Sequence, residues 1–234
     1  RMAAWREVAK RIAHEIKNPL TPIQLSAQRL RRKYPEILEA DDSVFDRCTK
    51  TIISQVEELK RLVSEFSQFA RMPKINKSPG NLVSLTENTL ILYQEAHKHI
   101  SFSCTASDDL PLFNFDAEQI KRSIINLLDN AVAVLPDSGK IDIDLSVQPE
   151  SQNVVIKVAD DGPGISKEDK LKLFEPYFST KKSGTGLGLA IVSTIVSDHG
   201  GYIRVVDNDP RGSVFVIELP IASDDHSHDH SHKD

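Results

Sequence analysis

Two long stretches near the start of the chain carry apolar residues at helical spacing, and they limit the fold more than any other feature. From residue 3 to 32 and from residue 45 to 70, an apolar position recurs every three or four residues, which is the period of an amphipathic α-helix. Tyr34-Pro35 and an acidic run separate them, so we expect an antiparallel helical hairpin. The stripes are Trp5, Val8, Ile12, Ile16, Leu20, Ile23, Ala27 and Leu30, then Phe45, Thr49, Ile52, Val56, Leu59, Val63, Phe66 and Ala70.

Each predicted helix has one apolar stripe, which a lone hairpin buries poorly. A second hairpin would complete a four-helix bundle, and we therefore predict a homodimer through this region.

The rest of the chain mixes strands and helices without the alternating rhythm of parallel βαβ units. It predicts an α/β sandwich, with one mixed sheet under a helical layer. Ser84 and Glu87 have the spacing of a capping box that opens a helix, and Asp116 is an N-cap candidate for the next helix. We expect an α+β chain with the hairpin at 1–73, a linker at 74–80, the sandwich at 81–221 and a polar, disordered His-rich tail at 222–234. The expected helices are 84–97, 116–134 and 187–199, and the expected strands are 100–105, 112–115, 140–147, 153–160, 202–206 and 213–219. Apolar and polar residues alternate in 140–147 and 153–160, which predicts a β-hairpin.

Composition narrows the function classes. The 234 residues are 27% charged with a net charge of −5, which argues against direct nucleic-acid binding. No apolar run approaches the roughly 20 residues that cross a bilayer. Cys48 and Cys104 lie far apart and form no CxxC pair, as in a reduced, cytoplasmic protein. Because the sequence starts inside a helical pattern, we expect a fragment of a longer protein.

The segment "HEIKNPLTP" at residues 14–22 contains two prolines inside a helical pattern, each of which costs roughly 3 kcal/mol in a helix interior. On a helical wheel His14 lies opposite the apolar stripe, and Glu15 and Asn18 share its outer half. A solvated surface histidine would explain His14 alone. The three polar residues beside a helix weakened at Pro19 instead suggest an exposed nucleophile that a separate domain can reach.

Two segments of the second half carry polar and glycine patterns suited to a nucleotide. Asn126 and Asn130 in "NLLDNA" share a helix face, and their carboxamide oxygens could hold Mg²⁺, although asparagines also cap or bridge. In "VADDGPGIS", Asp160 could accept a hydrogen bond from an adenine amino group, with Gly162 and Gly164 letting the base approach. A simple turn would also fit that segment.

Two later segments complete the pattern. "KLFEPYFSTKK" could be a core segment with solvated lysines, or a flexible cover that brings cations to phosphates. "GTGLGLAIV" joins glycines to a helix N-terminus, where amide groups favour phosphate oxygens. It is not a Walker A loop, because GxxxxGK[ST] does not occur in the chain.

Taken in this order after "HEIKNPL", these motifs resemble the H, N, G1, F and G2 boxes of sensor histidine kinases, and the resemblance covers residues 1–221. "RIAHEIKNPLTPIQLSAQRLRRKY" looks similar to the nitrogen-regulation, NtrY-like group. The resemblance implies a dimeric phosphotransfer hairpin followed by a GHKL-type ATP-binding domain. Ser213 stands where such proteins usually have threonine.

The resemblance also implies roles for individual residues. His14 would be the phosphoacceptor, Glu15 its proton acceptor, and Asn18 a positioner of water for dephosphorylating the partner. Asn130 and Asn126 would bind Mg²⁺. The implied nucleotide-binding residues are Asn126, Asn130, Asp160, Gly162, Gly164, Ile165, Tyr177, Thr180, Lys181, Gly184, Thr185, Gly186, Leu187, Gly188 and Ser213.

The implied activity is ATP-dependent autophosphorylation of His14, followed by transfer to an aspartate of a response-regulator receiver domain, with a further regulator-phosphatase activity. The implied location is cytoplasmic, with the full-length protein anchored in the inner membrane through upstream segments. Two alternatives remain open. One is a non-catalytic, nucleotide-gated interaction module, and the other is a GHKL ATPase or scaffold unrelated to signalling.

Overall fold

The computed structural model describes residues 2–38, 44–70, 74–180 and 185–221. It contains two compact units, a helical unit that includes residues 1–73 and a mixed unit that includes residues 74–182 and 188–234. Within the described residues, no helix is both long and apolar enough to cross a membrane. The His-rich tail predicted at 222–234 lies outside the described residues.

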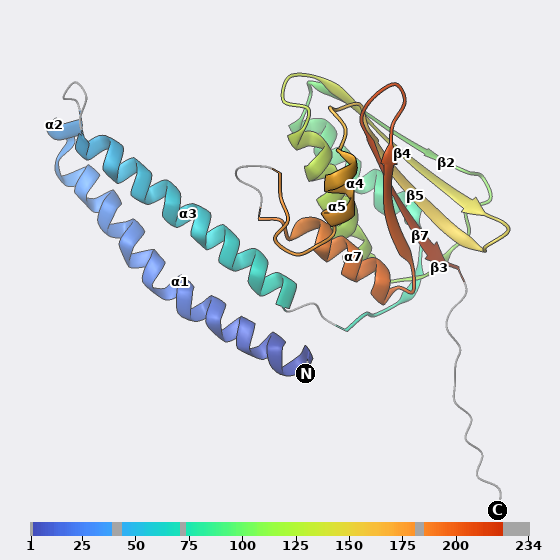
Figure 1. The fold of residues 1–234 in the computed structure, drawn as a ribbon, viewed down its shortest axis with the longest axis horizontal. Helices are drawn as coiled ribbons and strands as arrows, with labels where there is room; N and C mark the ends of the chain where they lie inside the picture. The colour runs from blue at the N-terminus through green and yellow to red at the C-terminus, as the bar shows by residue number, and fades with distance from the viewer. Residues whose placement is uncertain (1, 39–43, 71–73, 181–184, 222–234) are drawn as a thin grey trace, which may run out of the picture. The chain divides into compact units, whose positions relative to one another are not determined.

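The helical unit is the expected hairpin. Helix α1 (Met2–Lys33) and helix α3 (Val44–Ala70) run side by side, with the short helix α2 (Pro35–Leu38) after α1 (Figure 1). Helix α1 continues through Pro19 and Pro22, although a proline nitrogen cannot donate to the carbonyl four residues earlier. The prolines therefore leave α1 unbroken but remove two hydrogen bonds from it.

Buried residues of the hairpin follow a seven-residue repeat. Ala13, Leu20 and Ala27 on α1 are buried, as are Thr49, Val56 and Val63 on α3. A seven-residue repeat keeps one seam of each helix against the other. This seam is the hydrophobic core of the hairpin.

Polar side chains cross between α1 and α3 at the same interval, from Lys17, Gln24 and Arg31. The Lys17 ammonium donates to the Ser64 hydroxyl at 3.3 Å. Gln24 donates to Glu57 at 2.9 Å and accepts from Lys60 at 2.6 Å, and Arg31 pairs with Asp46 at 2.7 Å. We call these three crossings the polar rungs.

A second apolar row remains exposed on the hairpin. Ile16, Ile23 and Leu30 on α1 and Ile52 and Leu59 on α3 are each between 41% and 47% exposed. Ile23, Leu30 and Ile52 also line an apolar groove of about 380 Å³. The expectation that one hairpin covers its apolar stripes incompletely is therefore correct.

The mixed unit is built on a five-stranded sheet in the order β2-β4-β5-β7-β6. Strand β2 pairs with β4 in parallel, and the other neighbours are antiparallel, including the β4–β5 hairpin expected from the sequence. The bounds are β2 (Ile100–Ala106), β4 (Gly139–Gln148), β5 (Asn153–Asp160), β6 (Tyr202–Asp207) and β7 (Ser213–Pro220).

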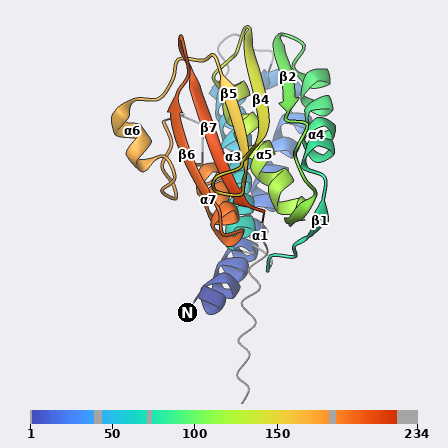
Figure 2. The same cartoon turned by 90° about the vertical axis from the view of Figure 1, so that its right-hand side faces the viewer.

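Three helices cover one face of this sheet, namely α4 (Leu82–Ala96), α5 (Ala117–Ala133) and α7 (Gly188–Asp198), as Figure 2 shows. Ile120, Ile124 and Leu127 of α5 are fully buried, as are Ile141 and Ile156 of the sheet. The other face carries ion pairs such as Arg204–Glu218 at 3.5 Å and Lys157–Asp144 at 3.6 Å. The predicted fold class, a helical hairpin followed by an α/β sandwich, is confirmed.

The start of α4 and the predicted linker differ from the sequence prediction. The N-cap of α4 is Asn81, whose side chain accepts from the Ser84 N–H at 3.0 Å, so the Ser84–Glu87 pair lies inside the helix. Asparagine caps helices as well as serine does, which explains the earlier start. In addition, the short strand β1 (Ser78–Gly80), in the predicted linker, pairs antiparallel with β3 (Phe113–Phe115).

Candidate functional site

Helix α5 presents its two asparagines on one flank. Asp116 caps the helix by accepting from the Gln119 N–H at 3.1 Å, as expected from the sequence. Burial of the apolar face against the sheet leaves Asn126 and Asn130 half-buried on the same side. The Asn126 amide nitrogen donates to the Arg122 carbonyl at 2.9 Å, so its amide oxygen points away from the helix backbone.

That oxygen lies against the start of α7. A Cβ atom placed on Gly188, the first residue of α7, would lie 2.9 Å from the Asn126 Oδ1 atom. Only glycine allows this approach without displacing the carboxamide. A neutral oxygen acceptor and the positive end of a helix dipole therefore meet at one point, which suits a phosphate group with a bound cation.

Strand β5 ends at Asp160, which belongs to a second group of predicted site residues. Asp160 is 5% exposed, and its register partner on β7 is Ser213, which is also buried. The Gly162 N–H donates to the Asp160 Oδ1 atom at 2.9 Å, and Asn208 donates to the Asp160 carbonyl at 2.9 Å. The carboxylate thus has a fixed orientation.

Gly162 brings this cluster to the end of α5. A Cβ atom on Gly162 would lie 2.7 Å from Asp160 Oδ1 and 2.9 Å from a methyl group of Val134, the C-cap of α5. Asn126 and Val134 are eight residues apart, or about 12 Å along the helix axis. A carboxylate at one end of this span and a phosphate-type site at the other match the extended shape of a nucleotide.

A hydrogen bond also joins α5 to α4. The Tyr93 hydroxyl of α4 donates to Asp129 at 2.5 Å, beside Asn130. Burial, together with this carboxylate, raises the pKa of Tyr93 well above its ordinary value, so the phenol keeps its proton. The contact fixes α4 and α5 together next to the second asparagine.

The glycine loop after β5 lines a hollow of about 420 Å³. Residues 163–166 form one side, and residues 207, 208 and 210–212 form the other. Gly164 has a φ of 81°, a left-handed conformation that suits glycine. Two predicted site residues, Gly164 and Ile165, therefore lie together at this hollow.

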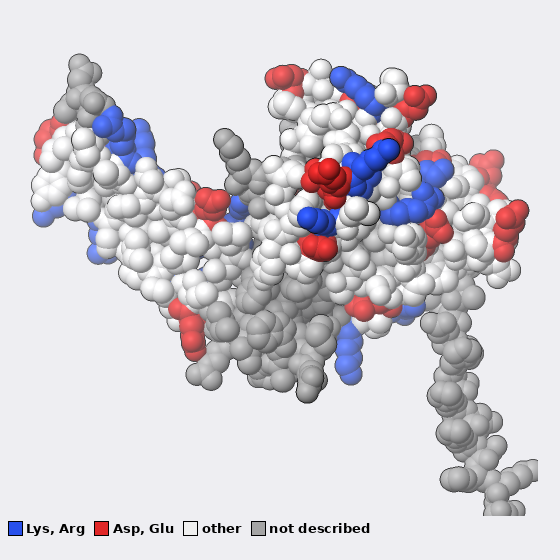
Figure 3. All heavy atoms as spheres, viewed as in Figure 1, with Lys and Arg blue, Asp and Glu red and all other residues white. Residues whose placement is uncertain are grey.

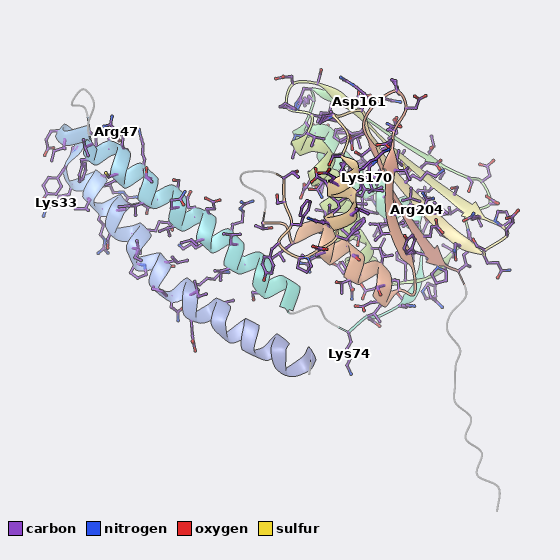
Figure 4. The ribbon with its side chains drawn as sticks, in the orientation of Figure 1. Lys33, Arg47, Lys74, Asp161, Lys170 and Arg204 are labelled. Atoms are coloured by element: carbon purple, nitrogen blue, oxygen red, sulfur yellow. The ribbon has the colours of Figure 1, made fainter. Side chains whose placement is uncertain are left out.

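The predicted cover segment contains a short helix, α6 (Lys167–Lys172), that the sequence prediction did not include. Ser166 caps it by accepting from the Asp169 N–H at 3.1 Å. Lys170 forms an ion pair with Asp207 of β6 at 2.5 Å, and Figure 4 labels Lys170 at this position. This contact fixes the start of the cover segment to the edge of the sheet.

The remaining predicted residues of the cover and the glycine-rich loop are described only in part. Tyr177 is exposed and has a φ of 67°, and Thr180 is exposed. Thr185 accepts from the Leu187 N–H at 3.4 Å, and Gly186 has a φ of 68°. Lys181 and Gly184 lie outside the described residues.

On the hairpin, the His14 backbone belongs to α1, but its side chain lies outside the described residues. Glu15 and Asn18 are exposed, as are Thr21 and Leu25, which lie seven and eleven positions after His14. Positions separated by these intervals share a helix face. The face of α1 on which His14 falls is thus opposite the exposed apolar row of Ile16 and Ile23.

Sequence reasoning missed Asn208, which holds the Asp160 carbonyl, and Val134, which lies against Gly162. The turn sequence "DNDP" at residues 207–210 was the available signal for Asn208, since asparagine commonly bonds to backbone in turns. No comparable signal marked Val134. In the face that Figure 3 shows, lysine and arginine side chains alternate with acidic ones over the mixed unit.

Comparisons with known proteins match both units of the chain. Residues 4–74 match the His Kinase A (phospho-acceptor) domain, and residues 115–223 match the histidine kinase-, DNA gyrase B- and HSP90-like ATPase domain. The chain therefore belongs to the sensor histidine kinases.

Within that family the similarity is to the NtrY-like group. The chain is 42% identical to nitrogen regulation protein NtrY of Azorhizobium caulinodans, over 96% of this chain and 29% of that protein. It is 36% identical to a putative NtrY-like sensor histidine kinase of Rickettsia typhi, over 94% of this chain and 37% of that protein. The chain thus spans about a third of the length of these curated relatives.

A solved structure matches both units. The histidine kinase ThkA in complex with the response regulator TrrA has a TM-score of 0.66 and 28% identity, over 92% of this chain and 61% of that one.

Replacing Gly188 with alanine tests the contact with Asn126. The new methyl group must displace the Asn126 oxygen, so we expect the affinity for a magnesium–ATP analogue to fall about fivefold, as for the loss of one hydrogen bond. The unfolding free energy should change by less than about 1 kcal/mol, because alanine favours a helix more than glycine does. Titration calorimetry and thermal melts measure both. Ser197→Ala, at an exposed position of α7, is the control, and equal affinities for the two variants would contradict the prediction.

Proposed function

We propose that this chain is the kinase portion of a sensor that phosphorylates His14 from ATP and passes the phosphoryl group to an aspartate of a response-regulator receiver domain. One observation carries the proposal. Asn126, Gly188, Asp160, Gly162 and Ser213 come from separate parts of the sequence, yet contacts at the two ends of one α5 segment bring them together. The test is transfer of radioactive phosphate from ATP to the chain as an acid-labile adduct.

The bound nucleotide is proposed to lie along this segment of α5. An ionised carboxylate offers about four acceptor positions, so Asp160 can accept from an adenine amino group while it also accepts from Gly162. The phosphates would lie near Gly188 at the start of α7, whose N–H groups offset their charge.

Magnesium fits the donors present. The Asn126 oxygen is oriented by the bond from its own amide to Arg122, and neutral carboxamide oxygens bind Mg²⁺ without repelling phosphate. Asn126 and Asn130 would hold the ion, which would neutralise part of the phosphate charge.

The proposed chemistry balances as a phosphoryl transfer. A ring nitrogen of His14 forms a bond to the γ-phosphorus, the bond from that phosphorus to the bridging oxygen breaks, and ADP leaves. Glu15, next along α1 and exposed, takes the proton from the other ring nitrogen. The same phosphoryl group then moves from the ring to the receiver carboxylate.

We also propose that two hairpins associate through the exposed apolar row. Ile16, Ile23 and Leu30 repeat every seven residues, as do Ile52 and Leu59, and this is the pattern that packs between helices in a bundle. The cytoplasmic location of this portion and the membrane anchoring of the full-length protein stay predictions.

Ile23→Asp tests the dimer. A charge in the apolar row would be buried without a partner in the bundle, so we expect a monomer at concentrations where the original chain is a dimer. Light scattering coupled to size exclusion measures this. Leu25→Asp is the matched control, because Leu25 is equally exposed but lies on the face of His14. It should remain dimeric and lower phosphoryl transfer to the receiver; a dimeric Ile23→Asp variant would refute the interface.

A further inference from the structure

Residues at the start of the mixed unit are hydrogen-bonded to two buried polar residues, Asp116 and His199, and form a polar cluster with them. The Asn76 N–H donates to the Asp116 Oδ2 atom at 2.9 Å, and the Lys77 ammonium donates to the His199 carbonyl at 3.3 Å. Strand β1 follows at once and pairs with β3. The predicted linker is therefore bound to the mixed unit from Asn76 onward.

The His199 side chain joins the same cluster. It is 2% exposed and Asp116 is 8% exposed. The His199 Nε2 atom accepts from the Asp116 N–H at 3.0 Å, and its Nδ1 atom lies 2.7 Å from the Ile195 carbonyl. Because a carbonyl only accepts, Nδ1 carries the proton and the ring is neutral.

This cluster lies at the far ends of both helices of the nucleotide site. Asp116 is the N-cap of α5, whose later turns carry Asn126 and Asn130. His199 directly follows α7, which begins at Gly188. One hydrogen bond, from the Asp116 N–H to His199, thus connects the two helices at the ends away from the Asn126–Gly188 contact.

The covalent path from the hairpin to this cluster is short. Helix α3 ends at Ala70, and Asn76 is six residues further on. Only a short stretch of sequence therefore separates the hairpin from the first residue of the cluster.

We propose that Asn76, Lys77, Asp116 and His199 form a clamp that makes nucleotide binding depend on docking of the linker, and that the clamp closes only while the His199 ring is neutral. The inference rests on the proposed function, because it concerns the same nucleotide site. His199 acts in it as a positioning residue for α5 and α7, since it does not touch the nucleotide site.

Protonation would break the clamp for a geometric reason. A proton on Nε2 would face the Asp116 N–H, so two donors would meet. Burial lowers the pKa of His199 below its ordinary value of 6.5, with Lys77 acting in the same direction, while the Ile195 carbonyl, Asp116 and Asp198 oppose the shift. A lowered pKa in the folded state means that the unfolded chain binds the proton first, so the stability from this group is present above pH 6.5 and is lost as the pH falls through the folded pKa.

The first experiment measures the affinity of the whole chain for AMPPNP with Mg²⁺ by calorimetry. We expect His199→Phe to weaken binding about tenfold, within the range of coupling between linked sites. His199→Gln should restore most of it, because its amide can occupy the Nε2 position as an acceptor. Lys77→Met should weaken binding about threefold. Lys74→Met is the matched control, because Lys74 is an exposed lysine of the same segment, directed away from the mixed unit (Figure 4), and should bind as the original chain does.

The second experiment compares about pH 7.5 with about pH 5.5. For each protein, the dissociation constant at the lower pH is divided by that at the higher pH. The ratio for the original chain is then divided by the ratio for His199→Gln. This division removes the effect of nucleotide protonation, because that effect is the same in every variant. We expect this quotient to be about three. We also expect the melting temperature to fall more on acidification in the original chain than in His199→Gln.

The outcomes separate the two proposals. If His199→Phe melts at a lower temperature but binds AMPPNP as tightly as the original chain, His199 is a core residue only and the clamp is refuted. A quotient of one refutes the requirement for a neutral ring. Both results leave phosphorylation of His14 intact. If the original chain does not bind AMPPNP, the proposed function fails and the clamp fails with it.

Discussion

His14→Gln is expected to abolish acid-labile labelling from radioactive ATP, with a loss of at least about 1000-fold, as when a nucleophile is removed from an enzyme. Glutamine keeps a polar side chain of similar length at the same position of α1. It lacks a ring nitrogen that can attack phosphorus, because an amide nitrogen is a poor nucleophile. Labelling followed by acid treatment and electrophoresis measures the loss.

Two controls make this result specific. AMPPNP affinity should not change in His14→Gln, since His14 belongs to the hairpin and the nucleotide site belongs to the mixed unit. His99→Gln removes an exposed histidine of the mixed unit and should keep full labelling. Acid-labile label that persists in His14→Gln would rule out His14 as the phosphoacceptor. Absence of label in the original chain, with AMPPNP still bound, would favour a non-catalytic, nucleotide-gated module.

Asp160→Asn is expected to reduce affinity for adenine nucleotides up to about 100-fold. Hydrogen bonds to charged groups contribute about 1.5–3 kcal/mol, and each 1.4 kcal/mol is tenfold in affinity. The substitution keeps the volume of the side chain but replaces one acceptor oxygen with a donor, which would face either the Gly162 N–H or the adenine amino group. Titration with AMPPNP measures the effect.

Asp161→Asn provides the matched control. Asp161 is the next residue, labelled in Figure 4, and its Oδ1 atom accepts from the Lys140 N–H at 2.8 Å. Its loss should lower the melting temperature slightly without changing nucleotide affinity. Equal losses of affinity in the two variants would show a general disturbance of the loop and would contradict adenine recognition by Asp160.

The sequence was most informative where one period or one cap determines the structure. Apolar spacing of three and four residues predicted α1 and α3, alternation predicted the β4–β5 hairpin, and Asp116 predicted the start of α5, because burial and capping act over a few neighbouring residues. The family motifs predicted Asn126, Asp160 and Gly188 as parts of one site.

Other features depend on contacts that no local pattern encodes. Strand β1 contains Pro79 and Gly80, which argue against a strand, and it forms because β3 offers a partner. The parallel pairing of β2 with β4 likewise depends on the whole sheet. His199 follows α7 in the sequence, and only the fold places it against Asp116, 83 positions earlier.

The polar rungs limit how the hairpin can move. Lys17–Ser64 and Gln24–Glu57 share one register, and Gln24–Lys60 and Arg31–Asp46 lie within about one helical turn of it. Axial sliding of one helix along the other would lengthen all of these contacts at once, whereas twisting or bending about the seam leaves each pair within reach. We therefore expect a stimulus that reaches the hairpin to rotate or bend its helices rather than to shift one of them along its axis.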